Sequence, residues 1–205
     1  MGIADTSIAA AAAALSGAAA VAAWRASREA NNTASSVAQI ERDRWHRELT
    51  PQLQLRIDPN NHFLYVRFVR PAALGRLQVQ LQVRDDRDRS QDPELAGSVT
   101  AQMRAEVIWG PYRFRPGIDG ADNLGRTLAP FFFEPDDLHR VAIDPTLTPT
   151  WFEGPTGEQR WREQYRTSPM RLWATCEAPG HKPWRLSCEP PWDGNPVLTE
   201  PPAGP

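Results

Sequence analysis

The chain has 205 residues, which is enough for one ordinary domain with appendages. Its net charge of −2 lacks the basic excess that phosphate backbones attract, so we do not expect a nucleic-acid-binding protein. Nearly all basic residues are arginines, with Lys182 the only lysine, which is typical of a GC-rich bacterial genome. Composition divides the chain into an alanine-rich hydrophobic helix (1–24), a helical stalk (25–50), a β-rich domain (51–190) and a proline-rich disordered tail (191–205).

Residues 6–24 carry no formal charge. As a helix, this segment is about 28 Å long, which just matches the roughly 30 Å hydrocarbon core of a bilayer. We therefore predict a single transmembrane span, with the lipid bilayer as its partner. Arg25 and Arg28 follow the segment and no basic residue precedes it. The positive-inside rule then places the N-terminus outside the cell membrane and the β domain in the cytoplasm.

Three other interpretations of the N-terminus remain open. A cleavable signal peptide is compatible with Ala20-Val21-Ala22 as a small-x-small cleavage pattern, although the usual basic n-region is missing. A buried alanine-rich helix of a soluble protein is the second alternative. Met1-Gly2 with Thr6 fits the N-myristoylation pattern, which has no meaning in a bacterial source.

Residues 25–50 continue the helical pattern, which we expect to end near Leu49 because Pro51 disfavours helix at Thr50. A stripe with 4-3-4-3-4 spacing and the motif Ala13-x-x-x-Gly17 are compatible with a coiled coil or a homo-oligomer through the helix. A lone stalk with incidental small residues is the simpler interpretation. The stripe consists of Ala26, Ala30, Thr33, Val37, Ile40 and Arg44.

The next 140 residues alternate apolar and polar positions in short runs separated by Pro and Gly, which indicates an antiparallel β-sandwich. A partly open barrel is the alternative. We expect the second strand, Phe63 to Val69, to be covered on both faces, and we expect a strand within 99–109 that ends at Val107-Ile108-Trp109. Further predicted elements are strands at 53–57, 77–83, 131–133 and 141–143, a turn at 58–61 and a short helix at 158–165.

The last predicted hairpin pairs 172–176 with 184–188 about Gly180. In this register Cys176 faces Trp184, and Cys188 faces Leu172. The two cysteines then lie about 13 Å apart along the ladder, beyond the roughly 7 Å limit for a disulfide. We expect buried free thiols, in keeping with a cytoplasmic domain.

Few residues have the spacing that catalysis or metal binding requires. The four histidines, at positions 46, 62, 139 and 181, have no second ligand at metal spacing, so we predict no metal site and no cofactor. The predicted inward face of Cys176 favours an inert core thiol over a nucleophile. Asp119 and Asp122 flank a glycine turn, and an Asx-type turn is favoured over a cation site because later calcium ligands are missing.

Aromatic residues with nearby arginines are the feature that favours binding. Two short runs, at 109–114 and 151–165, hold aromatic side chains beside Arg113, Arg115 and Arg162. Such residues are typical of surfaces that bind a protein segment or a glycan. The alternative is that they plug the ends of the sandwich core. The predicted ligand-binding residues are Trp109, Tyr112, Arg113, Phe114, Trp151 and Trp161.

The segment 108–117, with the sequence IWGPYRFRPG, resembles a group of uncharacterised actinobacterial proteins. The resemblance extends to residues 119–122, Gly125-Arg126, 169–172, Cys176 and Pro183-Trp184, and so covers most of the chain. It implies an N-terminal hydrophobic helix, a stalk and a β-rich domain. It implies no activity, cofactor or catalytic residue.

We therefore expect a membrane-anchored, non-enzymatic interaction module for an unknown protein partner. One alternative is a hydrolase or transferase with a non-local site built from Asp119, Asp122 and His139. Another is a structural component of the cell envelope, which self-association of the stalk would favour.

Overall fold

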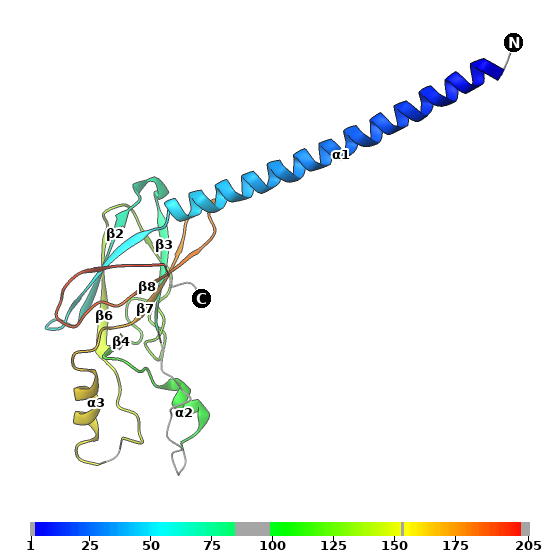
Figure 1. Cartoon of the computed structure of the whole chain (residues 1–205). Coiled ribbons are helices and arrows are strands. Elements are labelled where there is room, and N and C mark those ends of the chain that lie inside the picture. Colours follow the sequence, from blue (N-terminus) through cyan, green and yellow to red (C-terminus); the bar gives the residue numbers. More distant parts are fainter. Residues whose placement is uncertain (1–2, 85–98, 153, 202–205) are drawn as a thin grey trace. The chain divides into compact units, whose positions relative to one another are not determined.

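The computed structural model describes residues 3–84, 99–152 and 154–201. The chain divides into two compact units, Met1–Glu48 and Leu49–Pro205. The first unit consists of one helix, α1 (Ile3–Glu48; Figure 1). A continuous helix that ends near Leu49 was predicted, and this prediction is confirmed.

The surface of α1 leaves two of the sequence predictions untested. Across the parts of the chain that the structure describes, no helix combines the length and the hydropathy that a membrane span requires. This finding gives no support to the transmembrane span predicted within residues 1–24, which stays a prediction. In the predicted stripe, Val37 and Ile40 are 53% and 62% exposed, and self-association through them likewise stays a prediction.

The second unit is mainly β. Its described strands form two antiparallel sheets, one curled into a half-barrel, in the orders β4-β6-β2-β1-β9 and β5-β3-β7-β8 (Figure 1). The predicted fold class is confirmed. The elements are β1 (Gln52–Asp58), β2 (Phe63–Arg70), η1 (Ala72–Leu74), β3 (Leu77–Val83), α2 (Ala101–Glu106), β4 (Tyr112–Phe114), β5 (Phe131–Phe133), β6 (Leu138–Pro145), α3 (Gly157–Tyr165), β7 (Leu172–Glu177), β8 (Trp184–Cys188) and β9 (Val197–Leu198).

Strict alternation of apolar and polar residues builds the core between the sheets. Leu53, Leu55 and Ile57 of β1 are fully buried, as are Leu77 and Leu81 of β3. Burying each such side chain contributes about 1.5–3 kcal/mol, whereas the polar residues between them face outward. The pattern that predicts the strands is thus also the pattern that holds the two sheets together.

The β7–β8 hairpin has the predicted register. Leu172 pairs with Cys188, and Cys176 pairs with Trp184. Both cysteines are buried and unbridged, and burial raises the pKa of each thiol to about 12. Since the ladder itself keeps the two thiols apart, their free state follows from the fold and carries no information about the redox state of the compartment.

The strand predicted within 99–109 is wrong. Residues 101–106 form α2, and Val107-Ile108-Trp109 lies outside the strands. The Thr100 hydroxyl accepts a hydrogen bond from the Met103 N–H at 3.1 Å, which is an N-cap contact. Alanine, glutamine, methionine, arginine and glutamate are all good helix formers, so local propensity outweighs the scattered apolar residues.

The predicted disordered tail, 191–205, is also wrong for its described part. Val197–Leu198 forms β9 and pairs with β1. The Leu53 N–H donates to the Thr199 hydroxyl at 3.0 Å, and the Thr199 N–H donates to the Leu53 carbonyl. A short edge strand tolerates flanking prolines because they need no ladder partner there. The β domain therefore extends past residue 190, and residues 202–205 lie outside the described part.

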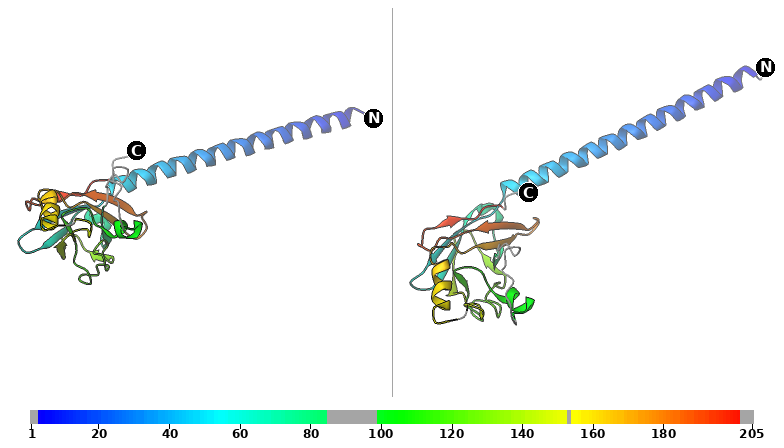
Figure 2. Two further views of the ribbon diagram at one scale, coloured as in Figure 1. Left: turned by 90° about the horizontal axis from the view of Figure 1, so that it is seen from below. Right: turned by 60° about the horizontal axis from the view of Figure 1, so that its bottom comes forward.

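One face of β2 is less covered than predicted. Its inward residues are fully buried, but Phe63 and Tyr65 on the other face are half-buried, and Val69 is exposed. Arginine side chains, rather than a second apolar layer, lie over the two rings. Elsewhere in this unit, α2 and α3 lie at one end, apart from each other (Figures 1 and 2).

Candidate binding site

Helix α3 organises a group of stacked aromatic rings at one end of the β unit. Trp161 of α3 lies 5.2 Å from Trp109, 5.2 Å from Phe152 and 4.8 Å from Tyr165 between ring centroids. Trp151 joins the group through Trp109, at 6.5 Å. These five residues form the tryptophan cluster. The predicted short helix at 158–165 is confirmed.

Two local features hold α3 in place. The Trp161 indole N–H donates to the Thr146 hydroxyl at 3.0 Å, and that hydroxyl donates to the Gly110 carbonyl at 2.6 Å. These bonds link α3 to the end of β6 and to the segment before β4. At the start of α3, Gly157 lies so close to the Phe152 carbonyl that a β-carbon there would overlap it. The cluster thus depends on a glycine as well as on large rings.

A cavity of about 230 Å³ opens beside the cluster. Its wall is mostly apolar, and Trp151 belongs both to this wall and to the tryptophan cluster. We call it the Trp151 cavity. Its lining comes from α2 and the segment after it, from β4 and the loop after it, and from the loop after β6. It includes Met103, Ile108, Arg113, Leu124, Leu147 and Trp151.

Arg113 is the cationic side chain in this wall. Its Nε is buried and has no hydrogen-bond partner within the described residues. One terminal nitrogen, Nη1, lies 3.5 Å from the Leu124 carbonyl, which is a long hydrogen bond. A buried N–H without an acceptor costs about 1–3 kcal/mol. The Arg113 guanidinium thus belongs to the cavity wall, although its Nε is enclosed by protein and is not itself exposed to the cavity.

The structure brings some of the predicted ligand-binding residues together. Arg113 and Trp151 line one cavity, and Trp109 packs against Trp151. Tyr112 is half-buried and packs against the core, where burial raises the pKa of its hydroxyl.

Phe114 and Trp161 have a different place from the one predicted. Phe114 is fully buried in the core, and Trp161 is 1% exposed. Neither side chain is accessible to a ligand, so the role of the two residues is structural. Their burial agrees with the alternative interpretation, in which aromatics close the end of the core, whereas Trp109 and Trp151 remain half-exposed.

Several lining residues escaped the sequence prediction. Met103 lies on α2, which was predicted as a strand, and Leu124 and Leu147 lie in loops without a periodic pattern. The helix-forming run after Thr100 was a usable signal for α2. No sequence signal places Leu124 beside Leu147, because loop positions converge only through the sheet topology.

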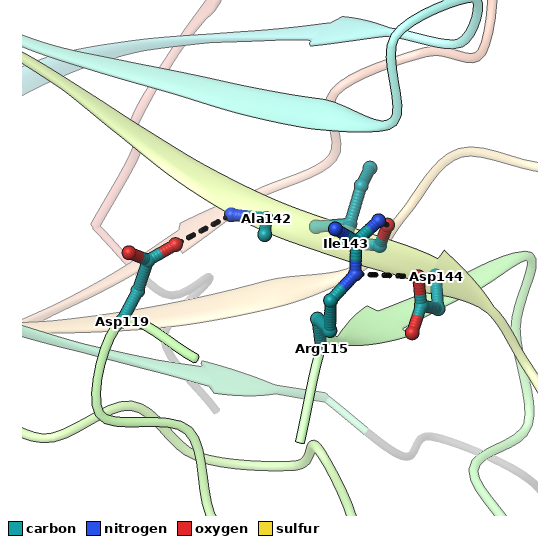
Figure 3. Close-up of polar contacts among 5 residues, drawn as sticks. All are labelled: Arg115, Asp119, Ala142, Ile143 and Asp144. Carbon is teal, nitrogen blue, oxygen red and sulfur yellow. Dashed lines mark hydrogen bonds and ion pairs between the residues drawn. The ribbon is translucent and has the colours of Figure 1, made fainter. Parts of the chain in front are cut away.

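Asp119 and Asp122 have structural roles. An Asp119 carboxylate oxygen accepts the Ala142 N–H at 2.8 Å (Figure 3). This N–H lies next to Ile143, the first residue along β6 that pairs with β4, so the carboxylate serves as its acceptor. Beside it, the Arg115 Nε donates to Asp144 at 2.9 Å (Figure 3). The Asp122 carboxylate accepts three backbone N–H groups, from residues 124, 126 and 127. The predicted Asx-type turn is confirmed.

His139 does not join the two aspartates in one site. Its ring packs against Phe131 and Phe133 at 5.0 and 4.6 Å between centroids. Asp119 binds the backbone three residues further along β6, about 10 Å away. Among the described residues, no group of three or more His, Cys, Asp or Glu side chains is arranged to hold a metal ion.

Compared with known proteins, the chain matches no protein-family model, no curated protein and no solved structure.

Proposed function

We propose that the chain is a non-enzymatic binding module, and that the Trp151 cavity receives an apolar side chain from a segment of a partner protein. The observation that carries the proposal is an apolar cavity with an arginine side chain in its wall. The apolar lining gains free energy from burying a ligand's apolar surface. Arg113 supplies orientation by donating to a carbonyl or carboxylate of the same ligand.

The size of the cavity supports a side chain rather than a whole cofactor. Pockets for drug-sized ligands occupy about 300–1,000 Å³, whereas this one is about 230 Å³. Tryptophan and arginine are also the residue types that dominate binding energy at protein interfaces. Trp151 and Arg113 lie together here, with Trp109 behind Trp151. The arrangement thus fits one anchoring side chain of a peptide segment.

The test is a peptide selection. A random peptide library displayed on phage is enriched on the full chain, and the binding of selected peptides is measured by fluorescence anisotropy. We expect enriched peptides to share an aromatic or aliphatic residue and to lose at least tenfold in affinity on the Trp151→Ala variant. The matched control is Trp192→Ala, because Trp192 is an exposed tryptophan of the same unit that does not line the cavity. Equal losses in the two variants would remove the cavity from the proposal.

We also propose that residues 6–24 attach the module to the cell membrane, with the N-terminus outside and the β domain in the cytoplasm. The support is the uncharged run followed by Arg25 and Arg28. The run is rich in alanine, which is only weakly apolar, so the prediction needs a direct test. Alkaline carbonate extraction of cell membranes should leave the full chain in the pellet and release a chain that lacks residues 6–24. Release of both chains would contradict the attachment.

A further inference from the structure

The outer face of the five-stranded sheet carries arginines and aromatic rings in register. Arg56 of β1 pairs with Tyr65 of β2, and Tyr65 pairs with Arg140 of β6. The three residues therefore form one row across three strands. Phe63 lies two residues before Tyr65 on the same face of β2. We call Arg56, Phe63, Tyr65 and Arg140 the arginine face.

Each of the two arginines lies over an aromatic ring. The guanidinium carbon of Arg56 lies 4.7 Å from the Tyr65 ring centroid, and that of Arg140 lies 4.4 Å from the Phe63 centroid. Cation–π contacts of this kind contribute about 0.5–1 kcal/mol at exposed sites. They also restrict the long arginine side chains, so less conformational entropy is lost when an anion binds.

The Asp58 carboxylate interacts electrostatically with Arg56, but it forms no close ion pair with it. Among the described residues, neither arginine forms an ion pair, whereas Arg67 beside them pairs with Asp136 at 3.1 Å. Asp58 follows on the same strand face as Arg56, but its carboxylate accepts hydrogen bonds from Asn61 and from the Asn60 N–H. The arginine face is thus a local positive surface on a chain of net charge −2.

The spacing of the two rings beneath the guanidinium groups indicates which kind of partner fits this face. Phe63 and Tyr65 are alternate residues of β2, about 7 Å apart, and one guanidinium lies over each ring. Alternate side chains of an extended peptide have the same spacing and point to the same side. We propose that the arginine face binds an extended acidic segment of a partner protein, with carboxylates at alternate positions, along β2. Each carboxylate accepts charge-assisted hydrogen bonds from one guanidinium.

This second surface is independent of the proposed function, because none of its four residues lines the Trp151 cavity. A polynucleotide also presents regularly spaced anions. Because the chain has a net charge of −2, a polynucleotide is the weaker candidate. Binding of a polynucleotide is one outcome of the experiment.

The experiment measures fluorescence anisotropy of a labelled octapeptide, GETETETG, with the full chain in a non-ionic detergent at low salt. Its control is the isomer GEETTETG, which has the same charge but no two glutamates at alternate positions. We expect the Arg56→Gln/Arg140→Gln variant to bind GETETETG at least tenfold more weakly than the unchanged chain. We expect the isomer to bind the unchanged chain at least threefold more weakly than GETETETG. Raising the salt to about 0.5 M should weaken binding further, because the Debye length falls below about 5 Å.

The matched control variant is Arg76→Gln. Arg76 is also an exposed arginine over a phenylalanine, Phe132, at 3.9 Å, but it lies beside the other sheet. The affinity of the Arg76→Gln variant for GETETETG should stay within twofold of the affinity of the unchanged chain. A charge reversal, Arg56→Glu/Arg140→Glu, should abolish binding of GETETETG and restore binding to the lysine counterpart GKTKTKTG.

Three results would overturn the proposal. Equal affinities of the Arg56→Gln/Arg140→Gln and Arg76→Gln variants would show that these two arginines are not the site. Equal affinities for the two isomeric peptides would show a general charge effect without the β2 spacing. Tighter binding of an eight-nucleotide oligothymidine than of GETETETG would assign the face to nucleic acid.

Discussion

Two regions of the β unit are built on aromatic rings, but the rings have opposite surroundings in the two regions. In the tryptophan cluster, rings pack against rings, and Trp161 at the centre is 1% exposed. On the arginine face, guanidinium groups lie over half-buried rings and stay in contact with solvent. Aromatic rings therefore support the fold in one region and underlie a charged surface in the other.

The difference shows that burial decides whether aromatic residues have a structural role or form a binding surface. In the tryptophan cluster, substitution should cost folding stability, because contacts and hydrogen bonds are lost in a water-excluded region. On the arginine face, substitution should cost little stability and should mainly alter charge-dependent binding. The following substitutions test the contrast, from the largest expected effect to the smallest.

Trp161→Ala should destabilise the β unit by about 3–5 kcal/mol, because a fully buried ring is replaced by a cavity. It also leaves the Thr146 hydroxyl without the indole N–H that it accepts. Urea unfolding followed by circular dichroism measures the change. Trp192→Ala removes a tryptophan that is 44% exposed and should cost much less. A Trp161→Ala cost below about 1 kcal/mol would show that the cluster is not structural.

Gly157→Ala should destabilise the unit by about 1–3 kcal/mol, the usual cost of overpacking. The added methyl group overlaps the Phe152 carbonyl, so the start of α3 must move away from the cluster. Gly110→Ala is the matched control, because a β-carbon there meets no atom within 4 Å. The difference in thermal unfolding midpoint between the two variants gives the result. Equal midpoints would mean that the close approach at Gly157 is not required.

Arg56→Gln/Arg140→Gln should lower the free energy of unfolding by at most about 2 kcal/mol, since each of the two exposed cation–π contacts contributes about 0.5–1 kcal/mol. The same urea titration used for Trp161→Ala measures it. A loss of several kcal/mol would break the comparison, because it would make the arginine face a structural element like the tryptophan cluster.

The smallest effect concerns Asp58, at the end of β1 beside the arginine face. Hydrogen bonds from the Asn61 side chain and backbone lower the pKa of Asp58, with a smaller contribution from the charge of Arg56. A lowered pKa means that the ionised carboxylate stabilises the folded state above the ordinary value of about 3.9, and that this stability is lost as the pH falls through the folded pKa. As the pH falls from 7 to 2, the midpoint temperature of thermal unfolding should therefore decline slightly less steeply for Asp58→Asn than for the unchanged chain. Identical profiles would contradict the role of the carboxylate.

The sequence predicts those parts of the fold that depend on strict alternation. The β7–β8 register follows from two alternating runs about Gly180, and the cores of β1 and β3 follow from their leucines. By contrast, α2 has only six residues, too few to show a helical period, and β9 has two residues among prolines. Elements this short are decided by capping and edge pairing, which depend on neighbours far along the chain.

The candidate site was predictable only in part. Aromatic runs beside arginines drew attention to Trp109, Arg113 and Trp151, and these residues do lie together around one cavity. The runs did not reveal that Phe114 and Trp161 are buried, since that depends on which face meets the other sheet. The arginine face is not predictable from the sequence, because Arg56, Tyr65 and Arg140 become neighbours only when three strands pair.

The most direct test of the central claim is the response of the tryptophan indole N–H signals in a ¹⁵N NMR titration with a peptide selected on the full chain. Trp109 and Trp151 lie at the cavity, whereas Trp173 and Trp192 lie elsewhere and serve as internal references. The account predicts large shifts of the Trp151 and Trp109 signals and little change in the reference signals. Shifts confined to Trp173 or Trp192, with Trp151 unmoved at saturation, would contradict it.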